Sequence, residues 1–369
     1  MLTPLRSLLL GGFIVLATML STSGDARYEN RLAVAAAASV NDHEALLSAM
    51  TYNVNALPWP IALGREAALG RIAERLAAMR RAGEQPRLVL LQEAFTADAS
   101  AIARRAGYRY VADGPDASLR SPELPGAADR LFLASARWDR GERSGKRLGS
   151  GLMILSDYPI VAIDRMSFPD FACAGFDCLA NKGVMLARIR VPGMAQPLMV
   201  ANAHLNARKA AGVSIARTRQ AYDRQVALMA AFVADRVRPG SPLLIGGDMN
   251  IGRDVGRARL FFGAFAQSGL AFVASRHGGL RQALEEAAWP DSRTQADLAH
   301  ADVHGKDWLF ARAADGRPMP IRAASVPFGT EPDGEPLSDH FGYMIDYALP
   351  GPAPATRFAH SAAPAQPRS

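Results

Sequence analysis

Apolar runs and amphipathic stretches alternate along residues 45–348, and this alternation predicts strands separated by helices. Within residues 65–81, Ile72, Leu76 and Met79 recur at helical spacing, and Gly83 ends that helix. Strands are expected at 49–55, 87–91, 151–155, 184–189, 198–203, 243–245, 308–311 and 343–347, and helices at 65–81, 100–106 and 214–238. No Pro-rich linker divides the region, so we expect one α/β domain over residues 45–349.

The two ends of the chain follow other patterns. Residues 1–6 are short and positively charged, residues 8–20 are apolar, and residues 21–26 are small and polar. This order is typical of a secretory signal peptide, here residues 1–26, whereas a membrane-spanning helix needs about 20 apolar residues. An uncleaved anchor or a buried helix is the alternative. Residues 27–44 are interpreted as a linker and residues 350–369 as a disordered Pro/Ala tail, so we expect a periplasmic or secreted protein.

Composition narrows the class of protein only a little. Of the 369 residues, 49% are hydrophobic and 21% charged, which allows a packed core and excludes global disorder. The net charge is +7, but three of these seven charges lie in residues 1–40 and 350–369. The remaining excess is mild and forms no long basic run. Histone-like proteins and polybasic arms are therefore excluded, whereas a nuclease is not.

The chain has two cysteines, Cys173 and Cys178, in a loop-like segment with Gly175 between them. A metal site needs more ligands than this pair offers. Export permits disulfides, so we favour a local disulfide that stiffens one loop. Two free thiols are the alternative, which a cytoplasmic location would support.

Polar residues follow or flank the predicted strands, where ligands of layered α/β folds usually bind. Singly, each has a structural reading as a cap, a turn or a hydrogen-bonded histidine. Together they offer oxygen ligands for a hard cation such as Mg²⁺, two histidines and an acid to orient one of them, a set suited to phosphoryl transfer. These residues are Asn53, Glu93, His204, Asp248, Asn250, Asp307, Asp339 and His340.

The motifs MTYNV, LLQEA, ANAHLN, IGGDMN, KDWLF and LSDH occur in one order along residues 49–347. Each is short, but the ordered set resembles the endonuclease/exonuclease/phosphatase superfamily with its deoxyribonuclease I-like fold. The resemblance implies a four-layer α/β/β/α sandwich with two mixed sheets, a catalytic domain over residues 45–349 and an active site at the top of the sandwich.

Three segments are most similar to bacterial neutral sphingomyelinases: YNVNALPWP, SGLMILSDYPI and CAGFDCLANKGVMLARI. The triplet Asn181-Lys182-Gly183 discriminates best. Inositol polyphosphate 5-phosphatases fit less well, because they carry Cys-Asp-Arg near the position of Lys306-Asp307-Trp308. The long aromatic-tipped hairpin of the secreted Gram-positive sphingomyelinases is not evident, which puts membrane disruption in doubt rather than the chemistry.

The resemblance implies a Mg²⁺ ion, with Mn²⁺ or Co²⁺ as substitutes. Glu93 would hold it with help from Asn53, and Asp339 would support the site.

The resemblance also assigns catalytic roles. His340 would be the general base, held in its working tautomer by Asp307. Asp248 and Asn250 would orient water and phosphate, with coordination of a second ion as the alternative. His204 would donate to the phosphate or protonate the leaving group. Lys182 would stabilise the phosphate. The alternative is that Lys182 is a solvated lysine in a loop.

The expected substrate is sphingomyelin or a similar phospholipid at a membrane surface, hydrolysed to ceramide and phosphocholine. Trp59, Phe168 and Phe171 are expected to contact the membrane, with buried loop anchors as the alternative reading of the phenylalanines. A nuclease of the same fold comes second, with nucleic acid as its partner. A non-catalytic lipid- or surface-binding module and another phosphoester substrate also stay open. We expect a monomer with no obligate protein partner.

Overall fold

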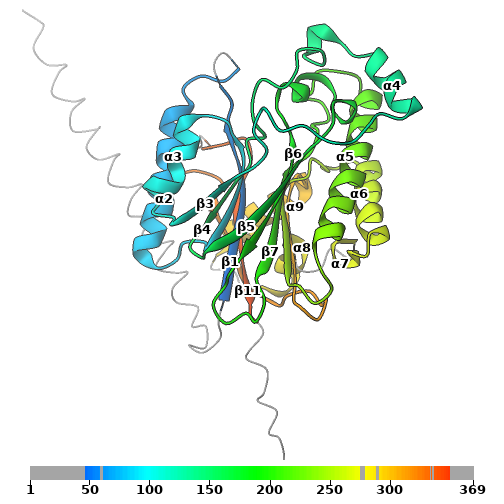
Figure 1. Cartoon of the computed structure of the whole chain (residues 1–369). Helices are drawn as coiled ribbons and strands as arrows, with labels where there is room; N and C mark the ends of the chain where they lie inside the picture. Colours follow the sequence, from blue (N-terminus) through cyan, green and yellow to red (C-terminus); the bar gives the residue numbers. More distant parts are fainter. Residues whose placement is uncertain are drawn as a thin grey trace, which may run out of the picture.

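Two mixed β-sheets pack face to face and helices cover their outer faces (Figure 1). The computed structural model describes residues 46–349 except 59–60, 275–278, 288–290, 333 and 335. The predicted signal peptide, the predicted linker and the predicted tail lie outside these residues, as does Trp59. No helix within the described ranges has the length and apolar character needed to cross a membrane.

The first sheet has six strands in the order β10-β11-β1-β2-β4-β3. Its central pair, β1 and β2, is parallel, and its other pairings are antiparallel. The strands are β1 Leu46–Ala56, β2 Leu88–Ala94, β3 Tyr110–Asp113, β4 Met153–Ser156, β10 Ile321–Phe328 and β11 Gly342–Ala348.

The second sheet has five strands in the order β5-β6-β7-β8-β9. Here β7 and β8 form the one parallel pair, and the other described pairings are antiparallel. The strands are β5 Ile160–Ser167, β6 Gly183–Ile189, β7 Leu198–His204, β8 Leu243–Asp248 and β9 Asp307–Arg312.

The helices divide between the two faces and one edge of the sandwich. α2 and α3 cover the first sheet, α5, α6 and α7 cover the second, and α8 and α9 pack beside β9 and β10 (Figure 1). α4 lies at one end of the sandwich. The helices are α2 Arg65–Ala82, α3 Ala97–Arg105, α4 Ala127–Ala134, α5 Ile215–Arg236, α6 Val255–Gln267, α7 Ala271–Ala274, α8 Leu280–Glu286 and α9 Ser292–His304.

The central core lies between the sheets, where both contribute fully buried apolar side chains such as Leu90, Ile154, Val200 and Leu309. Burial of apolar area of this kind is the main force that holds two sheets together. A polar link crosses the same interface, because Asn202 of β7 donates to the carbonyls of the first sheet at 2.9 and 3.0 Å. This link fixes the position of one sheet relative to the other.

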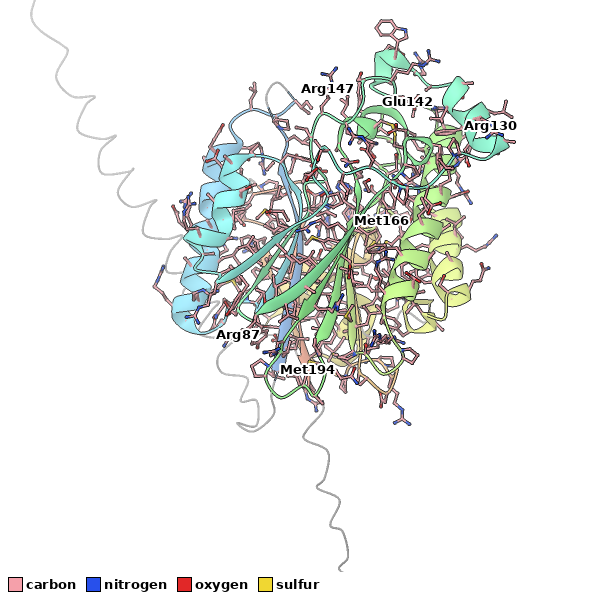
Figure 2. The ribbon with its side chains drawn as sticks, in the orientation of Figure 1. Arg87, Arg130, Glu142, Arg147, Met166 and Met194 are labelled. Atoms are coloured by element: carbon pink, nitrogen blue, oxygen red, sulfur yellow. A yellow bond between two sulfur atoms is a disulfide. The ribbon has the colours of Figure 1, made fainter. Side chains whose placement is uncertain are left out.

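The direction of the parallel strands determines where their ends meet. Arg87 precedes β2 and Met194 precedes β7, and both lie away from the end that carries Arg130, Glu142 and Arg147 (Figure 2). Both parallel pairs therefore run toward the α4 end. Polar residues at their carboxyl ends meet there.

All eight predicted strands and all three predicted helices are confirmed, with shifted bounds. The strands without a prediction are β3, β5 and β10, and each lies at the edge of a sheet. Edge strands expose alternate side chains, so they lack the continuous apolar run that marks a central strand. The prediction of two mixed sheets with helices on both faces is confirmed.

Candidate active site

The carboxyl ends of the two parallel pairs place four predicted residues together. Asn53 and Glu93 come from β1 and β2, and His204 lies directly opposite Asp248 on β7 and β8. Close approach of these last two strands depends on Gly247, whose φ is 132°, since a Cβ there would lie 2.0 Å from the carbonyl oxygen of Ala203. In the IGGDMN motif the backbone therefore requires glycine at Gly247, and Asp248, which follows it, supplies a carboxylate.

Asn53 links carboxylates from the two sheets. Its Nδ2 donates to Glu93 Oε1 at 3.1 Å and to Asp248 Oδ2 at 3.2 Å, and its Oδ1 accepts from the backbone N–H of Asn55 at 3.0 Å. The side chain is fully buried. Burial raises the pKa of Glu93, and the hydrogen bond from Asn53 opposes that rise.

The backbone is strained at Glu93 and at Asn250, which lies two residues after Asp248. Glu93 has φ 54° and Asn250 has φ 47°, in the left-handed region that residues other than glycine rarely adopt. Such a conformation costs about 1–2 kcal/mol per residue and persists only where the surrounding structure holds it. Asn250 is held by its N–H, which donates to Asp248 Oδ1 at 2.9 Å, and by its Nδ2, which donates to the carbonyl of Leu205 at 3.0 Å. The strain supports a functional role for both residues.

Asp307 and His340 form a hydrogen-bonded dyad. Nδ1 of His340 donates to Asp307 Oδ2 at 2.6 Å, and a carboxylate can only accept such a bond, so the proton of the ring is assigned to Nδ1. Nε2 then points toward Asp248, whose Oδ2 lies 3.8 Å away. The predicted orienting role of Asp307 agrees with this geometry.

Opposing effects set the pKa of His340. Burial by itself lowers the pKa, but the charges of Asp307 and Asp248 and the hydrogen bond to Asp307 outweigh it and raise the pKa to about 10. Burial also raises the pKa of Asp248, and the charge of His340 opposes that rise. In this arrangement the imidazole is protonated at neutral pH, so both of its nitrogens carry a proton.

Lys182 lies against His204 and is buried, so the alternative of a solvated loop lysine is wrong. Its Nζ lies 3.0 Å from His204 Nε2, 3.1 Å from the carbonyl of Leu205 and 3.0 Å from Asp177 Oδ2. An ammonium group has three protons, and these three partners use all of them. Lys182 therefore positions His204 in this arrangement, and the predicted contact with phosphate would require one of these bonds to break.

His204 is neutral and buried. Burial, and after it the charge of Lys182, holds its pKa well below the usual range. Since Lys182 donates to Nε2, the ring carries its proton on Nδ1, which has no hydrogen-bond partner among the described residues. Donation from His204 to a phosphate requires the other tautomer.

The cysteine loop supports this arrangement. Cys173 and Cys178 form the predicted disulfide, with their Cα atoms 5.2 Å apart, and Gly175 between them has φ 67°. The loop also carries Asp177, which pairs with Lys182. Sequence reasoning missed Asp177, although its place between the two cysteines and one turn before the Asn-Lys-Gly triplet is a usable signal.

The predicted membrane contacts at Phe168 and Phe171 are wrong. Phe168 is 2% exposed and Phe171 is 8% exposed, and both pack in the core beneath the second sheet. Aromatic side chains bury a large apolar area, and here that area stabilises the loop rather than facing a bilayer. The alternative reading, buried loop anchors, is confirmed.

Two further residues complete the surroundings. Asp339 is exposed, accepts a long hydrogen bond from Ser338 Oγ at 3.5 Å, and joins no other predicted site residue by a hydrogen bond in the described part of the chain. Its charge nevertheless raises the pKa of Glu93. Lys306, which sequence reasoning did not single out, places its Nζ 3.4 Å from His340 Nε2. Its position immediately before Asp307 in the KDWLF motif was the available signal.

The donor set fits a divalent cation. Glu93 and Asp248 offer carboxylate oxygens to the same amide, and Asn53 would add its own oxygen if its side chain turned over. Oxygen atoms of Asp248 and Asp307 and a nitrogen of His340 also lie within 4.8 Å of one another. The second group is less suitable, because a cation there would compete with the short bond of the Asp307–His340 dyad.

Two mixed sheets covered by helices, with acids, amides and histidines at the ends of both parallel pairs, define an α/β sandwich of the deoxyribonuclease I-like class. The chain belongs to the endonuclease/exonuclease/phosphatase family, whose model matches residues 50–367. No curated protein sequence matches the chain.

Solved structures of this fold superpose on most of the chain. A beta toxin of Staphylococcus aureus is 16% identical, with a TM-score of 0.54, over 82% of this chain and 100% of the toxin. A mutant of that toxin with bound magnesium ions is 16% identical, with a TM-score of 0.53, over 83% of this chain and 100% of its own. Sphingomyelinase C from Streptomyces griseocarneus is 19% identical, with a TM-score of 0.53, over 82% and 99%. At these identities the likeness establishes the fold.

Proposed function

We propose that this protein is an exported Mg²⁺-dependent phosphodiesterase that hydrolyses sphingomyelin or a similar phospholipid. The observation that carries the proposal is the Asp307–His340 dyad, whose Nε2 faces Asp248, one of the two carboxylates that Asn53 bridges. A base next to an oxygen-rich cation site is the arrangement that attack of water on phosphorus requires.

Each side chain of the centre has a role in this reaction. His340 takes a proton from water at Nε2 while Asp307 holds Nδ1–H. Asn250 and Asp248 position the water and the phosphate. His204, held by Lys182, has its Nε2 3.5 Å from Asp248 Oδ2 and 3.9 Å from Glu93 Oε1, and in its Nε2–H tautomer it would give a proton to the leaving alkoxide.

Glu93, Asp248 and Asn53 would hold Mg²⁺. When bound, Mg²⁺ would neutralise charge that develops on the phosphate and, by its positive charge beside the carboxylates, lower the pKa of His340 so that Nε2 accepts a proton. The magnesium ions in the mutant beta toxin support this metal.

Similarity in fold to a sphingomyelinase C supports the lipid substrate. A membrane contact must lie elsewhere than at Phe168 and Phe171. The exposed apolar side chains of residues 124–138 are better candidates, since Leu124 is 87%, Leu131 74% and Trp138 77% exposed. Figure 2 places Arg130 and Glu142, which flank Trp138 in sequence, at the α4 end of the sandwich, toward which the parallel strands run. Tryptophan favours the interface between water and lipid.

Export is supported by the Cys173–Cys178 disulfide, because such bonds persist in oxidising compartments. We also propose that the chain acts as a monomer.

Trp138→Ala should reduce hydrolysis of liposomes more than hydrolysis of soluble bis(4-nitrophenyl) phosphate. Equal losses on both substrates would remove Trp138 from the membrane contact.

The purified protein with Mg²⁺ is incubated with sphingomyelin liposomes and, in parallel, with supercoiled plasmid. Release of phosphocholine that EDTA and His340→Ala abolish supports the proposal, and His304→Ala, at an exposed histidine on α9, serves as the matched control. Plasmid nicking without lipid turnover would replace the lipid substrate by nucleic acid. Activity on neither, and none on bis(4-nitrophenyl) phosphate, would contradict a phosphodiesterase.

A further inference from the structure

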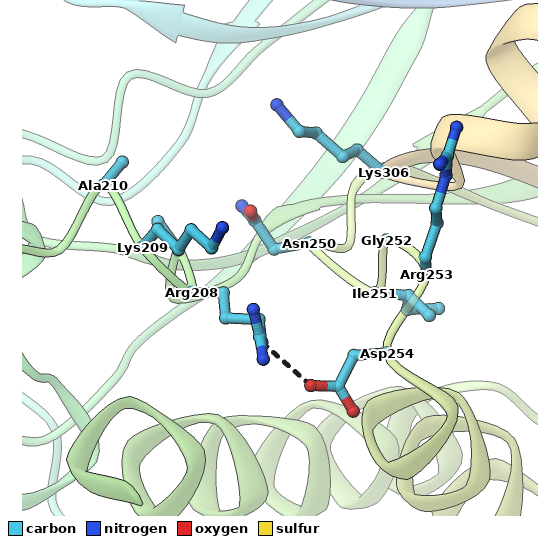
Figure 3. Close-up of a pocket in the computed structure, with 10 residues that line it drawn as sticks. Arg208, Lys209, Ala210, Asn250, Ile251, Gly252, Arg253, Asp254 and Lys306 are labelled. Carbon is cyan, nitrogen blue, oxygen red and sulfur yellow. Dashed lines mark hydrogen bonds and ion pairs between the residues drawn. The ribbon is translucent and has the colours of Figure 1, made fainter. Parts of the chain in front are cut away.

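A pocket of about 550 Å³ adjoins the catalytic centre (Figure 3). Arg208 and Lys209 reach it from the segment after β7, Asn250 and Arg253 from the segment after β8, and Lys306 from the segment before β9. Four of its ten lining residues are cationic. The volume is in the range of small-molecule sites.

The positive charge of the pocket is largely unpaired. Its one carboxylate, Asp254, accepts from Arg208 Nε at 2.9 Å and also caps α6 by accepting from two backbone N–H groups (Figure 3). Among the described residues, no carboxylate lies within ion-pair distance of Lys209, Arg253 or Lys306. Like charges gathered in a concave site attract an anion strongly.

Two of the lining residues contact the catalytic centre. Asn250 lines the pocket, and its N–H donates to Asp248. Lys306 also lines it, and its Nζ lies 3.4 Å from Nε2 of His340. A group bound in the pocket is therefore the immediate neighbour of the phosphate that reacts.

The lining does not suit a choline group. Proteins bind quaternary ammonium groups in aromatic cages, and no aromatic side chain is among the ten lining residues. A trimethylammonium group would instead meet three unpaired cations. A phosphorylated headgroup would find donors of opposite charge, and arginine and lysine are the usual partners of phosphate.

We propose that this pocket binds a second anionic group of the substrate, so that the preferred substrate is a phospholipid whose headgroup carries a phosphate besides the scissile phosphodiester. The inference rests on the phospholipid hydrolysis of the proposed function, and it replaces sphingomyelin, whose choline group carries no second phosphate, as the preferred substrate. A single cavity of headgroup size favours this occupant over a nucleic-acid strand, which needs a groove that follows its backbone.

In the reaction, the oxygen of water forms a new bond to phosphorus and the bond from phosphorus to the lipid oxygen breaks. The lipid leaves as an alcohol after taking up one proton, and water loses one proton to His340. The phosphorylated headgroup departs with the second phosphate intact. No oxidant or further reactant is needed.

The first test compares two vesicle populations with Mg²⁺: phosphatidylcholine containing sphingomyelin, and phosphatidylcholine containing phosphatidylinositol 4-phosphate. Released headgroup is measured, and kcat/KM is expected to be about tenfold higher for the phosphorylated lipid. In the double variant Lys209→Ala/Arg253→Ala this ratio should fall toward one. Arg238→Ala, at an exposed arginine after α5 that does not line the pocket, is the control and should keep the wild-type ratio.

The second test needs no turnover. Binding of inorganic pyrophosphate to the protein in EDTA is measured by calorimetry, and the double variant should bind about tenfold more weakly than the wild type and Arg238→Ala. Circular dichroism and thermal unfolding verify that the variants are folded. Undiminished pyrophosphate binding in a folded double variant would overturn the pocket assignment.

The outcomes separate this inference from the proposed function. Absence of hydrolysis of every vesicle and of bis(4-nitrophenyl) phosphate contradicts the proposed function, while pyrophosphate binding still reports on the pocket. Equal turnover of both lipids by an active enzyme contradicts the inference alone. Preferred cleavage of a single-stranded oligodeoxynucleotide over both lipids contradicts the phospholipid headgroup as occupant.

Discussion

The catalytic centre and the basic pocket share Asn250 but use charge in opposite ways. In the centre the charged side chains are buried and bonded to one another, as in the short Asp307–His340 bond. In the pocket Lys209 and Arg253 are exposed and have no carboxylate partner in the described structure. Paired buried charges hold a geometry, whereas unpaired exposed charges remain available for a ligand. The difference separates the residues that perform chemistry from those that select a substrate.

The largest expected effect lies in the centre. His340→Ala removes the base, so kcat should fall by about 10²–10⁴-fold. Asp307→Asn should lower kcat by a smaller factor, because the imidazole of His340 keeps its place but is no longer held in its working tautomer. Steady-state kinetics on liposomes and on bis(4-nitrophenyl) phosphate measure both. If His340→Ala retains wild-type kcat, the dyad is structural and the contrast between the two regions disappears.

Substitution of one lysine in each region tests whether paired buried charges contribute more to stability than unpaired exposed ones. Lys182→Met removes the cation that pairs with the largely buried Asp177 and leaves it only the N–H of Ala207, so the free energy of unfolding should fall by about 3 kcal/mol. Lys209→Met, at an exposed position, should change it by less than about 0.5 kcal/mol. Urea unfolding measures both variants. In Lys182→Met the pKa of His204 should also rise, because the charge of Lys182 lowers it, and NMR titration would detect this.

The cysteine loop supports the centre through the pair of Asp177 with Lys182, and it reaches the pocket lining through one hydrogen bond, from the N–H of Ala207 to Asp177. The disulfide should therefore matter more to the centre than to the pocket. Cys173→Ser/Cys178→Ser removes the constraint on the loop that carries Asp177, and closing a loop this short stabilises a protein by about 2 kcal/mol. We expect lower stability and lower kcat, with pyrophosphate binding retained. Weakened pyrophosphate binding in the folded variant would mean that the loop supports both regions.

The smallest effect concerns Asp346 on β11, away from both regions. Burial raises its pKa to about 6, so the folded state holds the proton more tightly than the unfolded chain. Stability therefore falls as pH rises from about 4 to about 6. Asp346→Asn should raise the free energy of unfolding by about 1–2 kcal/mol at pH 7 and leave it unchanged near pH 4. Equal effects at both pH values would show that charge is not the cause.

The sequence determined the order of the central strands, the helices that are amphipathic and the polar residues at the strand ends. A central strand is apolar throughout because both of its faces are buried, and the motif residues follow those strands directly. Asn53, Glu93, His204, Asp248, Asp307 and His340 could therefore be identified along the chain before any distance between them was known. The local sequence pattern was sufficient for strands that are buried on both faces, because such burial requires a continuous apolar run.

Only the tertiary structure decided which side chains face one another. Phe168 and Phe171 appear in sequence as loop aromatics, yet the fold buries them under the second sheet. Lys182 appeared as a phosphate ligand, but its three protons are taken by residues that reach it from other elements. The pocket likewise joins segments that follow β7 and β8 and precede β9. Contacts between distant segments depend on how the two sheets pack, and no local pattern records that packing.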